Sequence, residues 1–180
     1  MNKDLFENKK YTLIEESHFY TSEKKLELFG YGEWVEEADK IVFTYKDYDC
    51  MVHRVVCEEK VRSMRFMDGH LCGYVRIPQE HFSYGKDEFD EIDCHGGITF
   101  NDNNTVHKET SLLPAHWIGF DCAHSTDLVP SREMFNRDNP VVKQLRSLFE
   151  FMNPIYRNVA YCINECMLIV DKLIETQNIF

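Results

Sequence analysis

Residues 114–130 read PAHWIGFDCAHSTDLVP, and the fold can be interpreted outward from this stretch. Trp117–Phe120 is an apolar run typical of a buried strand. The run ends in side chains that can hydrogen-bond, titrate or bind a metal, namely Asp121, Cys122, His124, Ser125, Thr126 and Asp127. Because functional side chains are commonly placed at the ends of rigid strands, the sequence predicts a site here.

A second junction of this kind lies upstream, where Asp93–Gly97 reads DCHGG directly before the apolar Ile98–Phe100. We expect the two apolar runs to form neighbouring strands, which would bring His95 to the segment Asp121–Asp127. The polar segment Asn101–Lys108 between them predicts an exposed loop.

Other β-type runs precede these two. Lys40–Tyr45 and Cys50–Val56 are rich in β-branched and aromatic residues, and they predict a hairpin with a loop of about four residues. The Asp-Gly pair at positions 68 and 69 stands between Ser63–Met67 and Leu71–Ile77. This pair favours a type I′ turn and a second hairpin.

Helical patterns occur at both ends of the chain. Ser22–Phe29 predicts a short helix with Ser22 near its cap. Beyond Pro130, apolar residues recur every three or four positions, which predicts helices over 142–152 and over Pro154–Thr176. The apolar face of the last helix comprises Ile155, Val159, Ile163, Met167, Val170 and Ile174.

Strands followed by helices predict a single α+β domain, with an antiparallel sheet of about five strands and C-terminal helices packed on one face. A length of 180 residues is enough for one sizeable core. Within this domain, residues 1–32 form a polar N-terminal segment, 33–130 are mainly strands and site loops, and 131–180 are helical.

Charge and composition limit the partners. Twenty Lys and Arg against 31 Asp and Glu give a net charge of -11, which argues against general nucleic-acid binding but permits a locally positive pocket for a small anion. We find no apolar run of about 18 residues and no signal-peptide core, so we expect a cytoplasmic protein that does not enter a membrane. Seven cysteines without a C-x-x-C pair indicate reduced, mostly buried thiols.

Asp121, His124 and Asp127 are spaced three residues apart and, with His95, form a candidate metal site. Imidazole and carboxylate ligands suit a divalent metal such as Mn, Fe or Zn, which could activate water for hydrolysis. In the alternative interpretation the two carboxylates cap loop N–H groups and His124 is a structural histidine.

A second set of residues has side chains or backbone suited to ligand binding. His95, Gly96 and Gly97 could hold an anion on consecutive N–H groups, although a β-bulge explains the glycines equally well. Trp117 and Tyr84 could stack on a planar ring such as a nucleobase, or belong to the core. Arg157, at the start of the last helix, could reach an anion or simply be solvated. The ligand-binding candidates are therefore Tyr84, His95, Gly96, Gly97, Trp117, His124 and Arg157.

Three strings look familiar: LCGYVRIPQEH at Leu71–His81, HGGITF at His95–Phe100 and WIGFDCAHSTDLVP at Trp117–Pro130. They resemble motifs of a family of small phage and prophage proteins, HGG(I/L)TF and W-x-GFDCAH-x-x-D-x-x-P. The likeness spans roughly residues 34–166 and also includes Trp34, Asp39, Lys40, Tyr156, Arg157, Tyr161 and Glu165. Phe82 departs from the pattern, because the family usually has a proline there. The resemblance implies a phage-type origin and one pocket formed by the motif residues, and it carries no mechanism.

Together these observations favour a pocket protein that binds and sequesters a nucleotide-type, phosphate-bearing host defence signal. The alternative is a metal-dependent hydrolase or phosphodiesterase that cleaves such a nucleotide, with His95, Asp121, His124 and Asp127 as catalytic candidates. A third hypothesis is a structural or host-protein-binding module. Self-association into a homo-oligomer is a further candidate assembly.

Overall fold

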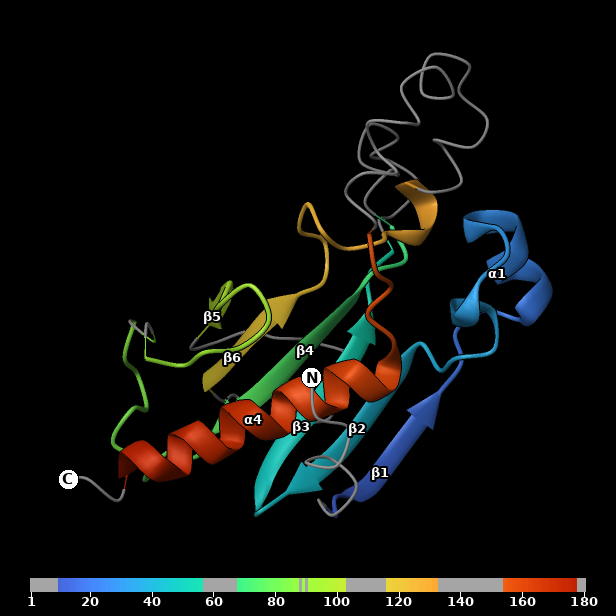
Figure 1. The fold of residues 1–180 in the computed structure, drawn as a ribbon. Coiled ribbons are helices and arrows are strands. Elements are labelled where there is room, and N and C mark those ends of the chain that lie inside the picture. The colour runs from blue at the N-terminus through green and yellow to red at the C-terminus, as the bar shows by residue number, and fades with distance from the viewer. Residues whose placement is uncertain are drawn as a thin grey trace.

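Six strands form one antiparallel sheet in the order β1-β2-β3-β4-β6-β5, and helix α4 crosses one face of it over β3 and β4 (Figure 1). The computed structural model describes residues 10–56, 68–87, 89, 91–102, 116–132 and 154–177. Its elements are β1 (Thr12–Ser17), α1 (Ser22–Phe29), η2 (Glu33–Val35), β2 (Lys40–Tyr45), β3 (Tyr48–Arg54), β4 (Leu71–Ile77), β5 (Phe100–Asp102), β6 (His116–Asp121) and α4 (Val159–Gln177). The α+β prediction is confirmed, with six strands where about five were expected.

The sheet has apolar side chains on both faces. Successive strand residues point to opposite faces, so Ile118 and Phe120 of β6 pack with α4, whereas Trp117 packs with Met51 and Tyr74 on the other face. The main core lies between the sheet and the buried face of α4, which comprises Cys162, Ile163, Cys166, Met167, Ile169, Val170 and Leu173. Among the described residues, no helix is long and apolar enough to cross a membrane.

Helix α4 begins at Val159 and not at Pro154, which corrects the predicted start. Asn158 accepts a hydrogen bond from the backbone N–H of Tyr161, which is the geometry of a helix N-cap. Upstream of it, Ile155 exchanges backbone hydrogen bonds with the segment 126–128 and is 52% exposed. Ile155 is therefore not on the core face, because the chain there is extended.

The turn between β2 and β3 differs from its prediction. β2 and β3 are joined by only two residues, Lys46 and Asp47, both with positive φ (50° and 67°). Such a pair matches the twist of a hairpin without glycine, so the predicted four-residue loop is wrong. Gly69 of the Asp-Gly pair has positive φ (90°), and the predicted type I′ turn includes Met67, which lies outside the described residues. The Gly69 N–H donates to the Val55 carbonyl and extends the pairing of β3 with β4.

Further corrections concern the edges of the sheet. β1 is an edge strand, and its mostly exposed residues lack the alternation of apolar and polar side chains that marks a half-buried strand. For this reason no strand was predicted within the polar segment 1–32. β5 is the other edge strand and includes Asn101 and Asp102, which were predicted to lie in a loop. Thr21, not Ser22, caps α1. The predicted strand at 63–67, the predicted helix at 142–152 and the loop residues 103–108 lie outside the described residues.

Candidate functional site

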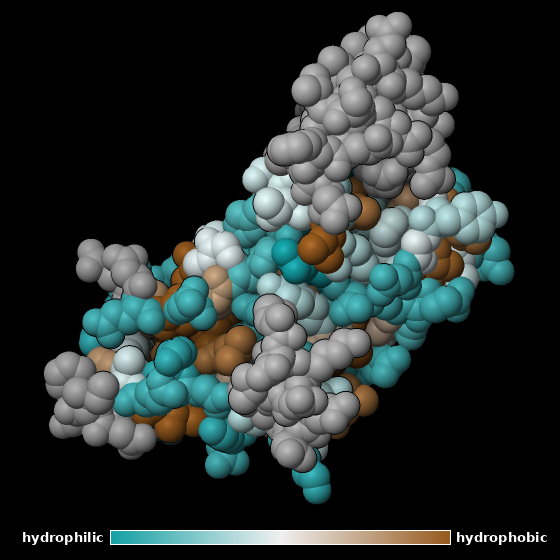
Figure 2. All heavy atoms as spheres, viewed as in Figure 1, coloured by the Kyte–Doolittle hydropathy of each residue, from teal (hydrophilic) through white to brown (hydrophobic). Residues whose placement is uncertain are grey.

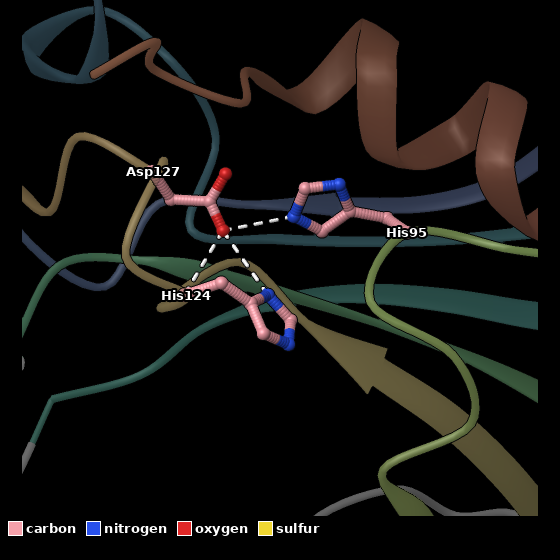
Figure 3. A group of neighbouring side chains, drawn as sticks. All are labelled: His95, His124 and Asp127. Carbon is pink, nitrogen blue, oxygen red and sulfur yellow. Dashed lines mark hydrogen bonds and ion pairs between the residues drawn. The ribbon is translucent and has the colours of Figure 1, made fainter. Parts of the chain in front are cut away.

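His95, His124 and Asp127 meet at the end of β6, where His95 comes from the loop before β5 and the other two follow β6 (Figure 3). Asp127 Oδ2 lies 2.8 Å from His95 Nε2 and 3.2 Å from His124 Nδ1. It also accepts the backbone N–H of His124 at 3.0 Å. The Asp127 side chain is fully buried, and Figure 3 shows both imidazole rings next to the same oxygen of its carboxylate.

Local backbone geometry places the His124 ring. Gly96 has a φ of +68°, and a Cβ there would lie 2.1 Å from His124 Cε1, so only glycine fits. Gly97 has a φ of +81° with open space around it. Its N–H donates to the Cys94 carbonyl and the His95 N–H donates to Glu165 Oε2. The backbone donors expected to bind an anion at His95 and Gly97 are thus used within the protein.

Arg157 joins the cluster from the extended segment before α4. Its Nε donates to Asp127 Oδ1 at 3.0 Å, and its guanidinium lies 4.8 Å from the centroid of the Tyr161 ring. Among the described residues, no hydrogen bond is formed by its two terminal nitrogens. The side chain is 20% exposed, so these nitrogens are the natural place for an anion to bind.

The charges of the cluster follow from Asp127. Burial raises the pKa of this carboxyl, but hydrogen bonds from His95 and Arg157 outweigh it and lower the pKa to about 2. An ionised carboxylate only accepts hydrogen bonds, so His95 Nε2 and His124 Nδ1 both carry hydrogens in this arrangement. In the neutral form of His124 the lone pair is then on Nε2, which points away from Asp127 in Figure 3.

Tyr161 and Glu165 form the next layer behind His95. The Tyr161 hydroxyl lies 3.0 Å from His95 Nδ1. Burial raises the pKa of Tyr161, and the nearby Glu165 carboxylate raises it further. The likeness to phage proteins included both residues but gave them no role. The sequence carries one sign of such a role, because two polar residues four apart on a mainly apolar helix lie on the same side.

The other site candidates do not join this cluster. Asp121 accepts hydrogen bonds from Thr99 Oγ1 and the Ala123 N–H. Trp117 is 2% exposed, on the face of the sheet away from α4. Tyr84 contacts the ring of His116 at the other end of β6, roughly 17 Å from Asp121 at strand spacing. The aromatic walls of the expected pocket therefore lie apart from the polar cluster.

A cavity of about 610 Å³ lies at the C-terminal end of α4 and does not include the cluster. Figure 2 shows hydrophobic residues gathered beside this end of the helix. The cavity is lined by Phe82, Ser83, Gly85, Lys86, Asp87, Phe89, Glu91, Ile92, Leu173 and Thr176. None of the predicted site residues lines it.

The cluster is suited to metal binding. One ligand atom from each of His95, His124 and Asp127 lies within 4.8 Å of the others, and two imidazoles with one carboxylate suit Mn, Fe, Co or Zn. A metal would replace the two hydrogens that the imidazoles now direct at Asp127. Without a metal, Asp127 orients His124 so that Nε2 can act as a base.

Comparison of the chain with protein-family models, with curated proteins and with solved structures gives no match. The likeness to small phage proteins stays a prediction. The fold and the cluster are therefore the starting point for a function.

Proposed function

We propose that the protein is a divalent-metal-dependent hydrolase of a small phosphate-bearing molecule of nucleotide type. One observation carries the proposal, the convergence of His95, His124 and Asp127 from two separate loops. The sequence favoured sequestration of such a ligand, chiefly because of an aromatic pocket. With Trp117 and Tyr84 away from the cluster, the metal alternative has the stronger support.

Arg157 supports a phosphate-bearing substrate. It is held beside the ligand atoms by its hydrogen bond to Asp127, and a guanidinium matches the geometry of a phosphate. A net charge of -11 repels long nucleic acids, whereas a small molecule can approach a local positive group. The phage-type likeness supports a nucleotide used by the host as a defence signal as the first substrate to test.

The proposed reaction is hydrolysis of a phosphate ester. The oxygen of water bonds to phosphorus, the bond from phosphorus to the leaving oxygen breaks, and the leaving oxygen takes a proton. A bound divalent metal would polarise the phosphoryl oxygen and make water more acidic. Arg157 would hold the phosphate and offset its developing charge.

Metal binding is tested first. The protein is stripped with EDTA, dialysed and titrated with Zn²⁺ or Mn²⁺ in a calorimeter. We expect one site per chain, lost in His124→Ala and in Asp127→Asn. Asp121→Asn is the matched control, because this neighbouring carboxylate bonds Thr99 and the Ala123 N–H and is not one of the three clustered ligands, so the metal affinity of the variant should equal that of the wild type.

Turnover is tested with a panel of cyclic nucleotides and ADP-ribose-type nucleotides, with added metal or with EDTA. After incubation the protein is heat-denatured and the released small molecules are separated. A metal-dependent product supports the proposal. If a nucleotide is bound tightly but returned intact, hydrolysis is overturned in favour of sequestration. If no nucleotide in the panel is bound or cleaved, hydrolysis and sequestration are both overturned in favour of a structural or protein-binding role.

A further inference from the structure

We infer that Tyr161 and Glu165 are positioning residues that stabilise the Nδ1–H tautomer of His95 when its Nε2 binds a metal. The inference rests on the metal site of the proposed function. It starts from two contacts on the side of His95 away from Asp127. Tyr161 hydroxyl lies 3.0 Å from His95 Nδ1, and Glu165 Oε2 accepts the His95 backbone N–H at 2.8 Å.

The hydroxyl of Tyr161 can bond His95 in either direction. In the first direction it donates to Nδ1, and Nε2 carries the hydrogen that is directed at Asp127. In the second direction it accepts from Nδ1–H, and its own hydrogen turns towards Glu165, which lies one helical turn further along α4 and accepts the His95 backbone N–H. The imidazole has the same net charge in both arrangements, and only the position of one hydrogen differs.

The arrangement with the hydrogen on His95 Nδ1 is favourable only when a cation is bound beside Nε2. With the hydrogen on Nδ1, the lone pair of Nε2 faces the Asp127 carboxylate across 2.8 Å, and two acceptors at that distance repel each other. A divalent metal held by His95 and Asp127 would remove this repulsion. Metal-binding histidines commonly donate their other ring N–H to a carboxylate, a backbone carbonyl or a water molecule. The Tyr161 hydroxyl is the acceptor in this place behind His95, and Glu165 holds the His95 backbone beside it.

The first test is metal affinity in Tyr161→Phe. Phenylalanine keeps the ring under Arg157 and removes only the hydroxyl, so we expect Zn²⁺ affinity to fall about 10- to 100-fold. Tyr156→Phe is the matched control, because Tyr156 is a second tyrosine near α4 whose hydroxyl bonds Glu37 and Arg54. Its Zn²⁺ affinity should be unchanged.

Glu165→Gln tests the contribution of the Glu165 carboxylate, which accepts the His95 backbone N–H. We expect a loss of Zn²⁺ affinity in the same direction and smaller than that of Tyr161→Phe, because an amide accepts hydrogen bonds less strongly than a carboxylate. Glu175→Gln is its control, because this glutamate lies near the C-terminal end of the same helix and pairs with the exposed Lys172. Equal affinities for wild type, Tyr161→Phe and Glu165→Gln would overturn the inference.

The second test reads the tautomer of His95 directly, from nitrogen-15 NMR of the two ring nitrogens. In wild type, Zn²⁺ should move the hydrogen from Nε2 to Nδ1, where the Tyr161 hydroxyl can accept it. In the metal-free protein, Tyr161→Phe should shift the Nδ1 resonance, because the nitrogen loses a donor. This metal-free comparison distinguishes a failure of the proposed function from a failure of the positioning role. A wild type that binds no metal overturns the proposed function, whereas an unmoved Nδ1 resonance overturns the positioning role.

Discussion

Two buried carboxylates, Asp39 and Asp127, each gather several donors, and their surroundings differ. Asp39 bonds Lys25 and Arg54 through Oδ1 and the backbone N–H groups of Phe19 and Tyr20 through Oδ2. The side chains of Lys25 and Arg54 are fully buried. The donors of Asp127 include His124 and Arg157, whose side chains are 33% and 20% exposed.

The difference suggests what each network does. The donors of Asp39 tie α1 and the start of β2 to β3, and with its donors buried the group can only hold the fold together. Asp127 fixes two side chains whose outer atoms reach the surface, which is the arrangement of a site with a buried support. The comparison predicts that changes at Asp39 affect stability, and that changes at Asp127 affect ligand binding more than stability.

The largest effect is expected for Asp39→Asn. It leaves Lys25 and Arg54 without their shared charge partner in the core, which should lower the free energy of unfolding by about 3–5 kcal/mol. Urea denaturation followed by circular dichroism measures this. Where the variant is still folded, its Zn²⁺ affinity should match the wild type, and a loss of affinity there would contradict the division between the two networks.

Asp127→Asn should have the next largest effect on stability. Lowering a carboxyl pKa from 3.8 to about 2 corresponds to about 2–3 kcal/mol at neutral pH, because one pKa unit is worth about 1.4 kcal/mol. Zn²⁺ binding should disappear in the same variant. A cost as large as that of Asp39→Asn, with metal binding retained, would make Asp127 a structural residue.

The sequence was sufficient to bring His95 together with the segment Asp121–Asp127, although Asp121 itself does not join the cluster. Trp117–Phe120 is apolar on both faces of a central strand, and the polar residues that follow it must lie at the end of the sheet. Residues 95–97 (HGG) lie at the same end of the sheet because they precede β5, which pairs with β6. Strand pattern and chain order together contain this information.

What could not be predicted depends on contacts between distant segments. Which face Trp117 occupies is set by the side on which α4 packs, and both faces of β6 are buried, so alternation does not reveal it. The role of Arg157 depends on the extended segment before α4. The apolar spacing that begins at Ile155 predicted a helix there, whereas α4 begins at Val159. Tyr161 and Glu165 reach His95 only once α4 lies across the sheet.

The pH dependence of stability separates Asp127 from its neighbours. Its folded pKa lies below the ordinary value, so its contribution is present above about pH 4 and is lost as pH falls through about pH 2. Urea unfolding of the EDTA-treated wild type should therefore lose about 2 kcal/mol between pH 4 and pH 2 beyond what Asp127→Asn loses. Parallel curves for the two proteins would mean that Asp127 is not held ionised by its donors.

The smallest difference in stability is expected between Gly96→Ala and Gly97→Ala. This pair of variants is also the sharpest test of the network around Asp127. Both glycines have positive φ, so each alanine should cost about 1–2 kcal/mol from backbone strain. Only at Gly96 would the added Cβ meet another group, the His124 ring at 2.1 Å. Gly96→Ala should therefore turn His124 away and weaken Zn²⁺ binding strongly, whereas Gly97→Ala should bind Zn²⁺ as the wild type does. If the two variants have equal affinities, the position of the His124 ring does not determine metal binding, and the site would have to be rebuilt around His95 and Asp127 alone.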